Sequence, residues 1–272
     1  MILKTLKTLN MQTTTNNTLN GLLTYCLEDG VTAFTTDRTI GRDEEKLKSI
    51  LADIRNTTKE SLRFARPHQT HGDRVMPIAE EFFSLPANTR QMLMEGVDAV
   101  MTNVPNAIIG VSTADCIPVI IYDPEHHCAA AIHAGWRGTM QRIVMKALEQ
   151  MRMMYHSNPA VCKAVIGPGI SLDSFEVGDE VYNAFIEAQF PMDDVASQYP
   201  TRTNECETPT QPMKWHIDLK EINRQLLIAL GIPADNIAVS SVDTFTDTRF
   251  FSARREQKGE TKCGRIFTGI VL

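Results

Sequence analysis

Three consecutive apolar segments in the middle of the chain constrain its fold most strongly. They are NAIIGVSTADC at 106–116, IPVIIYD at 117–123 and CAAAIHAG at 128–135, and they are punctuated by Asp, Pro, His and Gly. Short, nearly continuous apolar runs are typical of strands buried on both faces, as in sheets that other layers cover on each side. This part of the chain therefore predicts the centre of an α/β domain with mixed sheets and helices outside.

Helix and strand patterns continue on both sides of this centre. Apolar residues recur at helical spacing within 41–54 and within 138–154. Residues 81–95 are mixed, and a further helix is possible between Pro86 and Gly96. Residues 192–213 are polar and rich in proline, which favours a surface excursion. The other patterns predict helices at 177–189 and 219–231, a strand entering a polar turn at 62–72, and strands at 31–36, 161–170, 214–219, 236–241 and 264–272.

The chain length leaves the number of domains open. At about 150 residues per domain, 272 residues correspond to roughly 1.8 domains. A single domain of this size buries enough surface to fold without disulfides or a metal. Because the reactive segments described below are spread along the chain and must meet, we predict one domain over 21–272. The Thr/Asn-rich start predicts a flexible N-terminal segment over 1–20.

Composition excludes several classes of protein. With 27 Lys and Arg against 33 Asp and Glu, the formal charge of −6 argues against a nucleic-acid partner. The absence of a long apolar stretch or an apolar signal region predicts a cytoplasmic protein without a membrane partner. The six cysteines include no CxxC pair, so reduced thiols are expected rather than a disulfide scaffold.

Three segments place reactive side chains and turn residues at the ends of apolar strands. They are QTHG at 69–72, TADC at 113–116 and HAGWRG at 133–138. A His, a Cys and a His suit Zn²⁺ with a fourth position left open for water, which is the arrangement of catalytic sites. The separations between these residues match no short zinc motif. An inert buried thiol at Cys116 and a satisfied core histidine at His133 therefore remain alternatives.

The ordered set QTHGDRV, DAVMTN, STADCIPVIIYD, AAIHAGWRGTM, IGPGIS and FFSARR resembles the YfiH-type multicopper-oxidase-like family, also called laccase-domain proteins. The resemblance runs from about Phe34 to the C-terminus, and HAGWRG and TADC are its most specific parts. It implies a single-domain, four-layer α/β/β/α fold like that of the catalytic domain of cytotoxic necrotizing factor. It also implies a metal site at His71, Cys116 and His133, usually holding zinc and in some members copper.

The resemblance further implies an enzyme of purine nucleosides. The expected reactions are phosphorolysis of adenosine, inosine and methylthioadenosine to the free base and ribose 1-phosphate, and deamination of adenosine. The expected partners are therefore a nucleoside and phosphate, and the protein itself is expected to be a monomer or a small homo-oligomer. A copper-dependent polyphenol oxidase and a non-catalytic or peptidoglycan-editing protein are the alternatives.

Candidate catalytic residues follow from that chemistry. Cys116 is expected in the site as a metal ligand, and Asp115 beside it is a candidate proton shuttle, although capping of a turn or helix is an equal alternative for this carboxylate. Arg137 is the candidate for holding phosphate, because backbone N–H groups of the Gly-rich turn can share the anion. The chain departs from the family after Phe34–Thr36, where a short DRTIGRDEEKLKSIL replaces a longer stretch. This shortening is expected to remove part of the cover of the pocket mouth.

Overall fold

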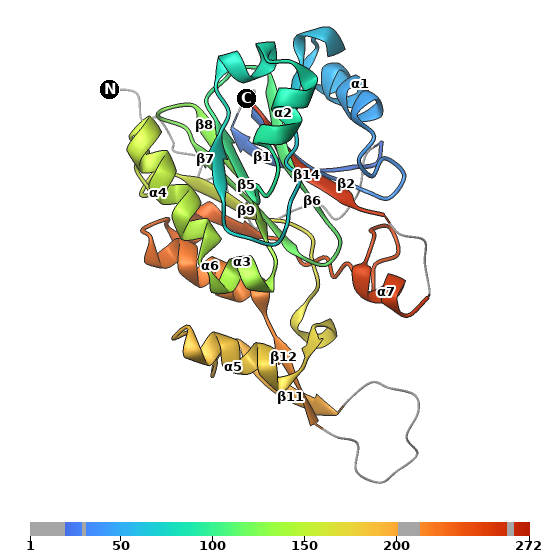
Figure 1. Ribbon diagram of the computed structural model, residues 1–272, viewed down its shortest axis with the longest axis vertical. Helices are drawn as coiled ribbons and strands as arrows, with labels where there is room; N and C mark the ends of the chain where they lie inside the picture. Colours follow the sequence, from blue (N-terminus) through green and yellow to red (C-terminus); the bar gives the residue numbers. More distant parts are fainter. Residues whose placement is uncertain (1–19, 29–30, 201–212, 260–263) are drawn as a thin grey trace, which may run out of the picture.

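The computed structural model describes residues 20–28, 31–200, 213–259 and 264–272. The predicted flexible segment 1–20 lies outside this range except for its last residue. Within the described residues the chain forms four layers, in the order helix, sheet, sheet, helices (Figure 1). The predicted four-layer α/β/β/α architecture is therefore confirmed.

The first sheet has the strand order β1-β2-β14-β6-β3. Its neighbours are antiparallel except β3 and β6, which run parallel, so the sheet is mixed. The strands of this sheet are β1 (Leu22–Glu28), β2 (Val31–Thr36), β3 (Arg63–Ala65), β6 (Ala107–Thr113) and β14 (Ile266–Val271).

The second sheet has the order β13-β9-β7-β8-β5-β4 and is also mixed, with parallel pairs at its two edges. Its central strands are β7 and β8, every residue of which is buried, as their apolar runs predict. The strands of this sheet are β4 (Val75–Pro77), β5 (Ala99–Thr102), β7 (Ile117–Asp123), β8 (Cys128–Ala134), β9 (Lys163–Ile166) and β13 (Ile237–Val239).

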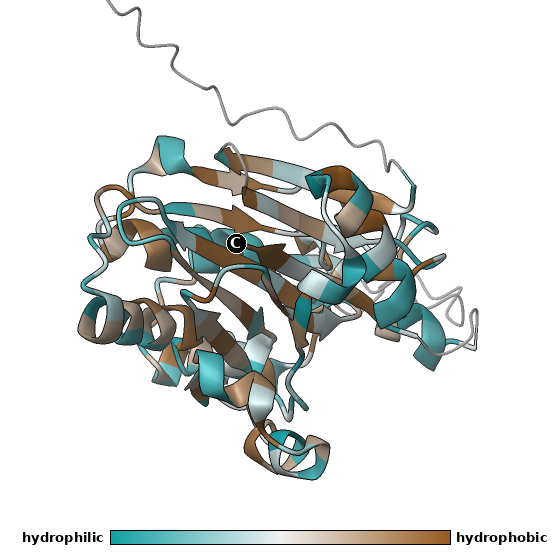
Figure 2. Cartoon of the chain, turned by 90° about the horizontal axis from the view of Figure 1, so that it is seen from above, coloured by the Kyte–Doolittle hydropathy of each residue, from teal (hydrophilic) through white to brown (hydrophobic). Residues whose placement is uncertain are grey.

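Helices cover the outer faces of the two sheets, and a core lies between the sheets. α1 (Glu44–Arg55) packs Leu47 and Leu51 against the first sheet. Helices on the far side pack against the second sheet, and the apolar colour of Figure 2 is concentrated on the strands between these layers. The far-side helices are α3 (Trp136–Met140), α4 (Ile143–Tyr155) and α6 (Leu219–Ala229).

A third, small sheet projects from this body. It has the order β10-β12-β11 and carries α5 on one side (Figure 1). Its elements are β10 (Glu176–Val177), β11 (Ala196–Pro200), β12 (Met213–Ile217) and α5 (Asp179–Glu187). The predicted surface excursion at 192–213 thus contains a strand in its described part.

One predicted helix differs from the observed structure for a local reason. The helix expected at 138–154 is split, because Arg142 adopts a left-handed backbone conformation with φ of 58° between α3 and α4. The helix expected between Pro86 and Gly96 is confirmed as α2 (Ala87–Leu93), which begins directly after Pro86 because proline suits a helix start and not its interior, and a short 3₁₀ turn precedes it. The short helical elements not yet named are η1 (Lys59–Ser61), η2 (Glu80–Ser84), η3 (Leu172–Ser174), η4 (Ala234–Asn236) and α7 (Ala253–Gln257).

Strand β1 has no counterpart among the predicted elements. It lies at the edge of the first sheet, and its buried and exposed residues alternate over most of its length. None of the helices in the described ranges combines the length and the apolar character needed to cross a membrane.

Candidate metal centre

The ligand-bearing turns lie where the chain passes from one sheet to the other. β3 of the first sheet leads through loop 66–74 to β4 of the second, and this loop carries His71. β6 of the first sheet leads directly to β7 of the second, and the turn between them carries Cys116. His133 lies near the end of β8, paired with Pro118 of β7. The two segments that connect the sheets, together with strand β8, therefore bring these three side chains together.

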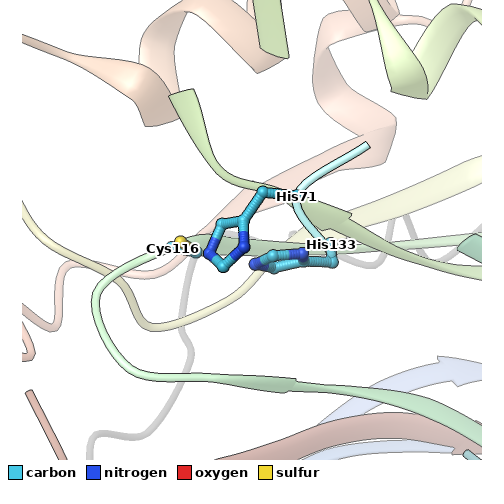
Figure 3. Close-up of side chains that lie close together, drawn as sticks. All are labelled: His71, Cys116 and His133. Atoms are coloured by element: carbon cyan, nitrogen blue, oxygen red, sulfur yellow. The ribbon is translucent and has the colours of Figure 1, made fainter. Parts of the chain in front are cut away.

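His71, Cys116 and His133 form one cluster (Figure 3). One possible ligand atom of each residue lies within 4.8 Å of the others. The two imidazole rings meet edge to face, with centroids 4.9 Å apart. His133 is buried, Cys116 is half-buried and His71 is exposed, so the cluster reaches from the sheet to the surface.

Asp98, which sequence reasoning did not single out, organises this cluster. This fully buried carboxylate lies just before β5 and accepts a hydrogen bond of 2.7 Å from Nδ1 of His133. It also accepts hydrogen bonds from the backbone N–H groups of Thr70, His71 and Gly72 at 2.8–3.2 Å. Since Nδ1 of His133 is bonded to Asp98, Nε2 remains free to bind a metal ion, and metal-binding histidines usually donate their other ring N–H to a carboxylate in this way.

Gln69 holds the same loop against the first sheet. Its amide donates a hydrogen bond of 2.8 Å to the carbonyl of Ser112 and accepts one of 2.8 Å from the N–H of that residue. A side chain thereby replaces a neighbouring strand beside β6. The loop that carries His71 is thus fixed at one end by Gln69 and at the other by Asp98.

The charges of the cluster reinforce one another. Burial would raise the pKa of Cys116, but the imidazoles of His133 and His71 lower it well below its ordinary value. Burial would likewise lower the pKa of His133, but Cys116 and Asp98 raise it. Asp98 is buried too, yet the hydrogen bonds from His133 and Gly72 keep its pKa low. A thiolate is therefore favoured at Cys116, and the thiolate is the form that binds metals.

Two glycines allow the backbone to approach the cluster closely. A Cβ on Gly135 would lie 3.0 Å from Sγ of Cys116 and 3.4 Å from Cδ2 of His71. A Cβ on Gly169 would lie 2.5 Å from Cδ1 of Ile117 and 3.0 Å from the carbonyl oxygen of Asp115. The Gly-rich turns of HAGWRG and IGPGIS thus supply space beside the ligands.

A cleft of about 280 Å³ opens at the cluster. His71, Cys116 and His133 line it, together with the guanidinium-bearing residues Arg42 and Arg265. Arg42 lies two residues before the start of α1. Neither arginine was predicted from the sequence, because neither lies within one of the motifs described above.

Asp115 points its carboxylate toward the C-terminal segment. Its oxygens accept hydrogen bonds from Thr244 Oγ1 at 2.7 Å, Ser252 Oγ at 2.9 Å and the N–H of Arg254 at 2.7 Å. The last of these caps the first turn of α7, as the capping alternative requires. Asp115 itself has a left-handed backbone with φ of 79°. Its predicted role as a proton shuttle stays a prediction.

Arg137 lies on α3, just after Gly135. Its side chain is exposed, and Cζ lies 4.2 Å from the ring centroid of Trp136, which is a cation–π contact. It does not occur among the residues that line the cleft in the described structure. Its predicted role in holding phosphate also stays a prediction.

The donor set fits a transition metal. Two imidazole nitrogens and a thiolate are ligands that Zn²⁺ prefers, and three protein ligands leave one position open. A set of two His and one Cys is also found around copper. The chemistry of the residues therefore indicates a metal centre and leaves the choice between these metals to experiment.

Comparisons with known proteins show the family of the chain. The model of the family described as multi-copper polyphenol oxidoreductase laccase matches residues 32–272. A purine nucleoside phosphorylase of Bacteroides thetaiotaomicron is 36% identical over 91% of this chain and 87% of its own. An adenosine deaminase, RL5, of an unknown prokaryotic organism is 40% identical over 75% of this chain and 73% of its own.

A solved structure supports the same relationship. The hypothetical protein YfiH of Bacillus licheniformis superimposes with a TM-score of 0.74 at 28% identity, covering 93% of this chain and 97% of that protein. The fold, the ordered motifs and the matched length agree with the resemblance seen in the sequence. The chain therefore belongs to the multi-copper polyphenol oxidoreductase laccase family, the laccase-domain family that its motifs resemble.

Proposed function

We propose that this protein is a metal-dependent enzyme of purine nucleosides. The observation that carries the proposal is the convergence of His71, Cys116 and His133 in a cleft, in a chain whose relatives are named purine nucleoside phosphorylase and adenosine deaminase. The proposed reactions are phosphorolysis of adenosine, inosine and methylthioadenosine, and deamination of adenosine. We propose zinc as the bound ion.

The two reactions make different demands on the site. In phosphorolysis a phosphate oxygen bonds to C1′ of the ribose while the glycosidic C–N bond breaks, and the base takes up a proton. In deamination water adds at C6 of adenine, and ammonia leaves. A zinc ion in the site would act as a Lewis acid and activate water. Arg42 and Arg265 supply positive charge in the cleft for the phosphate of the first reaction.

The chain's own residues position the metal ligands. Asp98 fixes the tautomer of His133 through Nδ1 and holds the backbone on both sides of His71. Cys116 contributes the thiolate. Asp115 remains the candidate proton carrier and Arg137 a further candidate for binding phosphate, and these are the roles that the sequence predicts for them.

The assay uses zinc-loaded protein and adenosine, with and without phosphate. Without phosphate we expect inosine, and with phosphate we expect free base and ribose 1-phosphate in addition. Cys116→Ala is the matched control and should lose both products together with its stoichiometric zinc. If the zinc-loaded wild type forms neither inosine nor free base, the proposal is wrong.

A copper-dependent polyphenol oxidase is the second candidate. The description of the family and the suitability of two His and one Cys for copper favour it. It predicts that the copper-loaded protein oxidises a phenol, with loss in Cys116→Ala, while adenosine is not converted by the zinc-loaded form. The same two preparations therefore decide between the candidates.

A further inference from the structure

A second cleft, of about 390 Å³, lies beside the metal cleft. The two share Arg42, Pro67 and His68 in their linings, so they adjoin at these residues. The walls of the second cleft come from the start of α1, from β3 with the loop that follows it, and from α2. The loop that presents His71 to the metal cleft therefore also forms a wall of the second one.

Arginines give this cleft a positive charge. Arg42, Arg66 and Arg90 line it, and the carboxylate in its lining is that of Glu44. Oε1 of Glu44 already pairs with Lys48 at 3.0 Å. In a chain with a formal charge of −6, this is a local excess of positive charge. Such an excess next to a reactive site favours anionic ligands.

The guanidinium groups are held in place yet incompletely paired. Nη1 of Arg66 donates a hydrogen bond of 3.0 Å to the carbonyl of Arg42, and Cζ of Arg66 lies 5.7 Å from the ring centroid of Phe64. Burial and the nearby Arg42 lower the pKa of Arg66. Nε of Arg90 is buried and meets no hydrogen-bond acceptor within the part of the chain that the structure describes. Guanidinium groups of like charge that line one cleft favour an anionic ligand between them.

We propose that this arginine cleft, defined by Arg42, Arg66 and Arg90, binds a phosphoryl group. Guanidinium groups match phosphate oxygens with paired hydrogen bonds, which a point charge such as lysine does not reproduce. The inference rests on the proposed function, since phosphate is a reactant there. The phosphoryl group comes either from inorganic phosphate or from the 5′-phosphate of a purine nucleotide.

Separate calorimetric titrations of the zinc-loaded protein with inorganic phosphate, with inosine 5′-monophosphate and with inosine test this proposal, because neither purine ligand is converted in the absence of free phosphate. Arg66→Gln and Arg90→Gln each remove one guanidinium. Arg152→Gln is the matched control, because Arg152 is exposed on α4 and pairs with Glu149 at 3.6 Å. We expect the affinity for the phosphoryl ligand to fall about tenfold or more in the first two variants and to stay unchanged in the control.

The three titrations identify the source of the phosphoryl group. Weaker binding of inorganic phosphate in the two variants assigns the cleft to the free ion. Tighter binding of the monophosphate than of inosine, lost in the same variants while inorganic phosphate does not bind, assigns it to a nucleotide. A wild type that binds neither ligand overturns the proposal, as do affinities that are equal in all variants or that fall equally in Arg152→Gln.

Thermal unfolding of each variant checks the fold. If a glutamine variant is unfolded, Arg66→Lys and Arg90→Lys carry the test. They keep the charge but lose the paired geometry, so binding should weaken severalfold, and unchanged binding in both overturns the proposal. Because the titrations measure binding and not turnover, the two proposals fail independently. An unchanged affinity in the variants would contradict the arginine cleft but not the enzymatic activity, and inactivity toward adenosine would contradict the activity but not the titrations.

Discussion

His133 and His71 belong to the same proposed metal centre but are held in opposite ways. His133 lies within β8, is 3% exposed, and donates from Nδ1 to Asp98. His71 is exposed on a loop between the two sheets, with a left-handed backbone at φ of 64°. One ligand therefore takes its position from a buried strand, and the other from hydrogen bonds to the backbone around it.

Asp98 is the link between these two arrangements. The same carboxylate receives the imidazole of His133 and the backbone N–H groups of residues 70–72. A loop that is exposed at its tip is thereby tied to a group that is fully buried. The exposed His71 is thus positioned through hydrogen bonds to the backbone around it, whereas His133 is positioned through a hydrogen bond to its side chain.

Removing Asp98 should break both arrangements at once and have the largest effect. Asp98→Ala leaves Nδ1 of His133 and three backbone donors without their acceptor, so we expect unfolding free energy to fall by about 3 kcal/mol. Zinc affinity should fall on the order of 10- to 100-fold. Chemical denaturation of the metal-free protein and chelator competition measure the two. Asp98→Asn, which keeps one acceptor oxygen, should lie between the alanine variant and the wild type.

Replacing the two histidines separately should distinguish the strand-held ligand from the loop-held ligand. His71→Asn keeps a residue that tolerates the left-handed conformation. It should lose zinc affinity by on the order of 100-fold, with the unfolding free energy of the metal-free protein changed by less than about 0.5 kcal/mol. His133→Ala should lose zinc affinity and also about 2 kcal/mol of unfolding free energy, because it opens a cavity and removes the imidazole donor of the buried Asp98. Equal destabilisation by both variants would contradict this distinction.

A methyl group at Gly135 should disturb the centre with a smaller effect. The Cβ in Gly135→Ala would crowd Cys116 and His71 while the backbone, at φ of −66°, suits any residue. We expect zinc affinity to fall about tenfold and the unfolding free energy of the metal-free protein to change by roughly 1 kcal/mol. The rise in melting temperature that zinc produces reports the first change, since a ligand stabilises the state that it binds. An unchanged rise would show that the cluster can move aside.

The smallest effect on the metal centre itself is expected at Lys220, which is linked to the turn that carries Cys116 only through residues 240–244 and Asp115. Its buried Nζ donates to the carbonyls of Ser240 and Val242, just before Thr244, which bonds to Asp115. Burial lowers the pKa of Lys220 to about 8. Between that value and the ordinary lysine pKa of about 10.4 the unfolded chain binds more protons, so this group makes unfolding free energy rise with pH.

Chemical denaturation at several pH values within that window tests Lys220. The increase of unfolding free energy with pH should be smaller in Lys220→Met than in the wild type. The slope is the measure, because the substitution also removes hydrogen bonds and lowers stability at every pH. Parallel slopes in the two proteins would contradict a proton-dependent role for Lys220.

The fold was predictable where local pattern reports burial. The apolar runs of β7 and β8 are buried throughout, and the apolar face of α1 packs against the first sheet. The pattern did not reveal β1, which follows a polar segment and has only one consistently covered side. It also did not reveal the break at Arg142, because helical spacing continues across it.

The residues of the site likewise include some that local pattern revealed and others that it did not. His71, Cys116 and His133 could be selected from the sequence, since reactive side chains at the ends of buried strands are locally visible. Asp98 also precedes a short strand at 99–102 and begins the DAVMTN motif, and these were the available signals for it. Its partners come from loop 66–74 and from β8, so its role required knowledge of contacts between distant segments.

Residue pattern indicated an α/β domain with mixed sheets and three reactive segments at strand ends, because both are visible along short stretches. The resemblance of the motifs to the laccase-domain family supplied the four-layer α/β/β/α arrangement and the proposed metal ligands. Tertiary structure was needed to show that Asp98 joins the two histidines and that Arg42 and Arg265 line the metal cleft. It also directed the carboxylate of Asp115 toward the C-terminal segment. These features depend on contacts between groups that are distant along the chain, and such contacts cannot be deduced from spacing along the sequence.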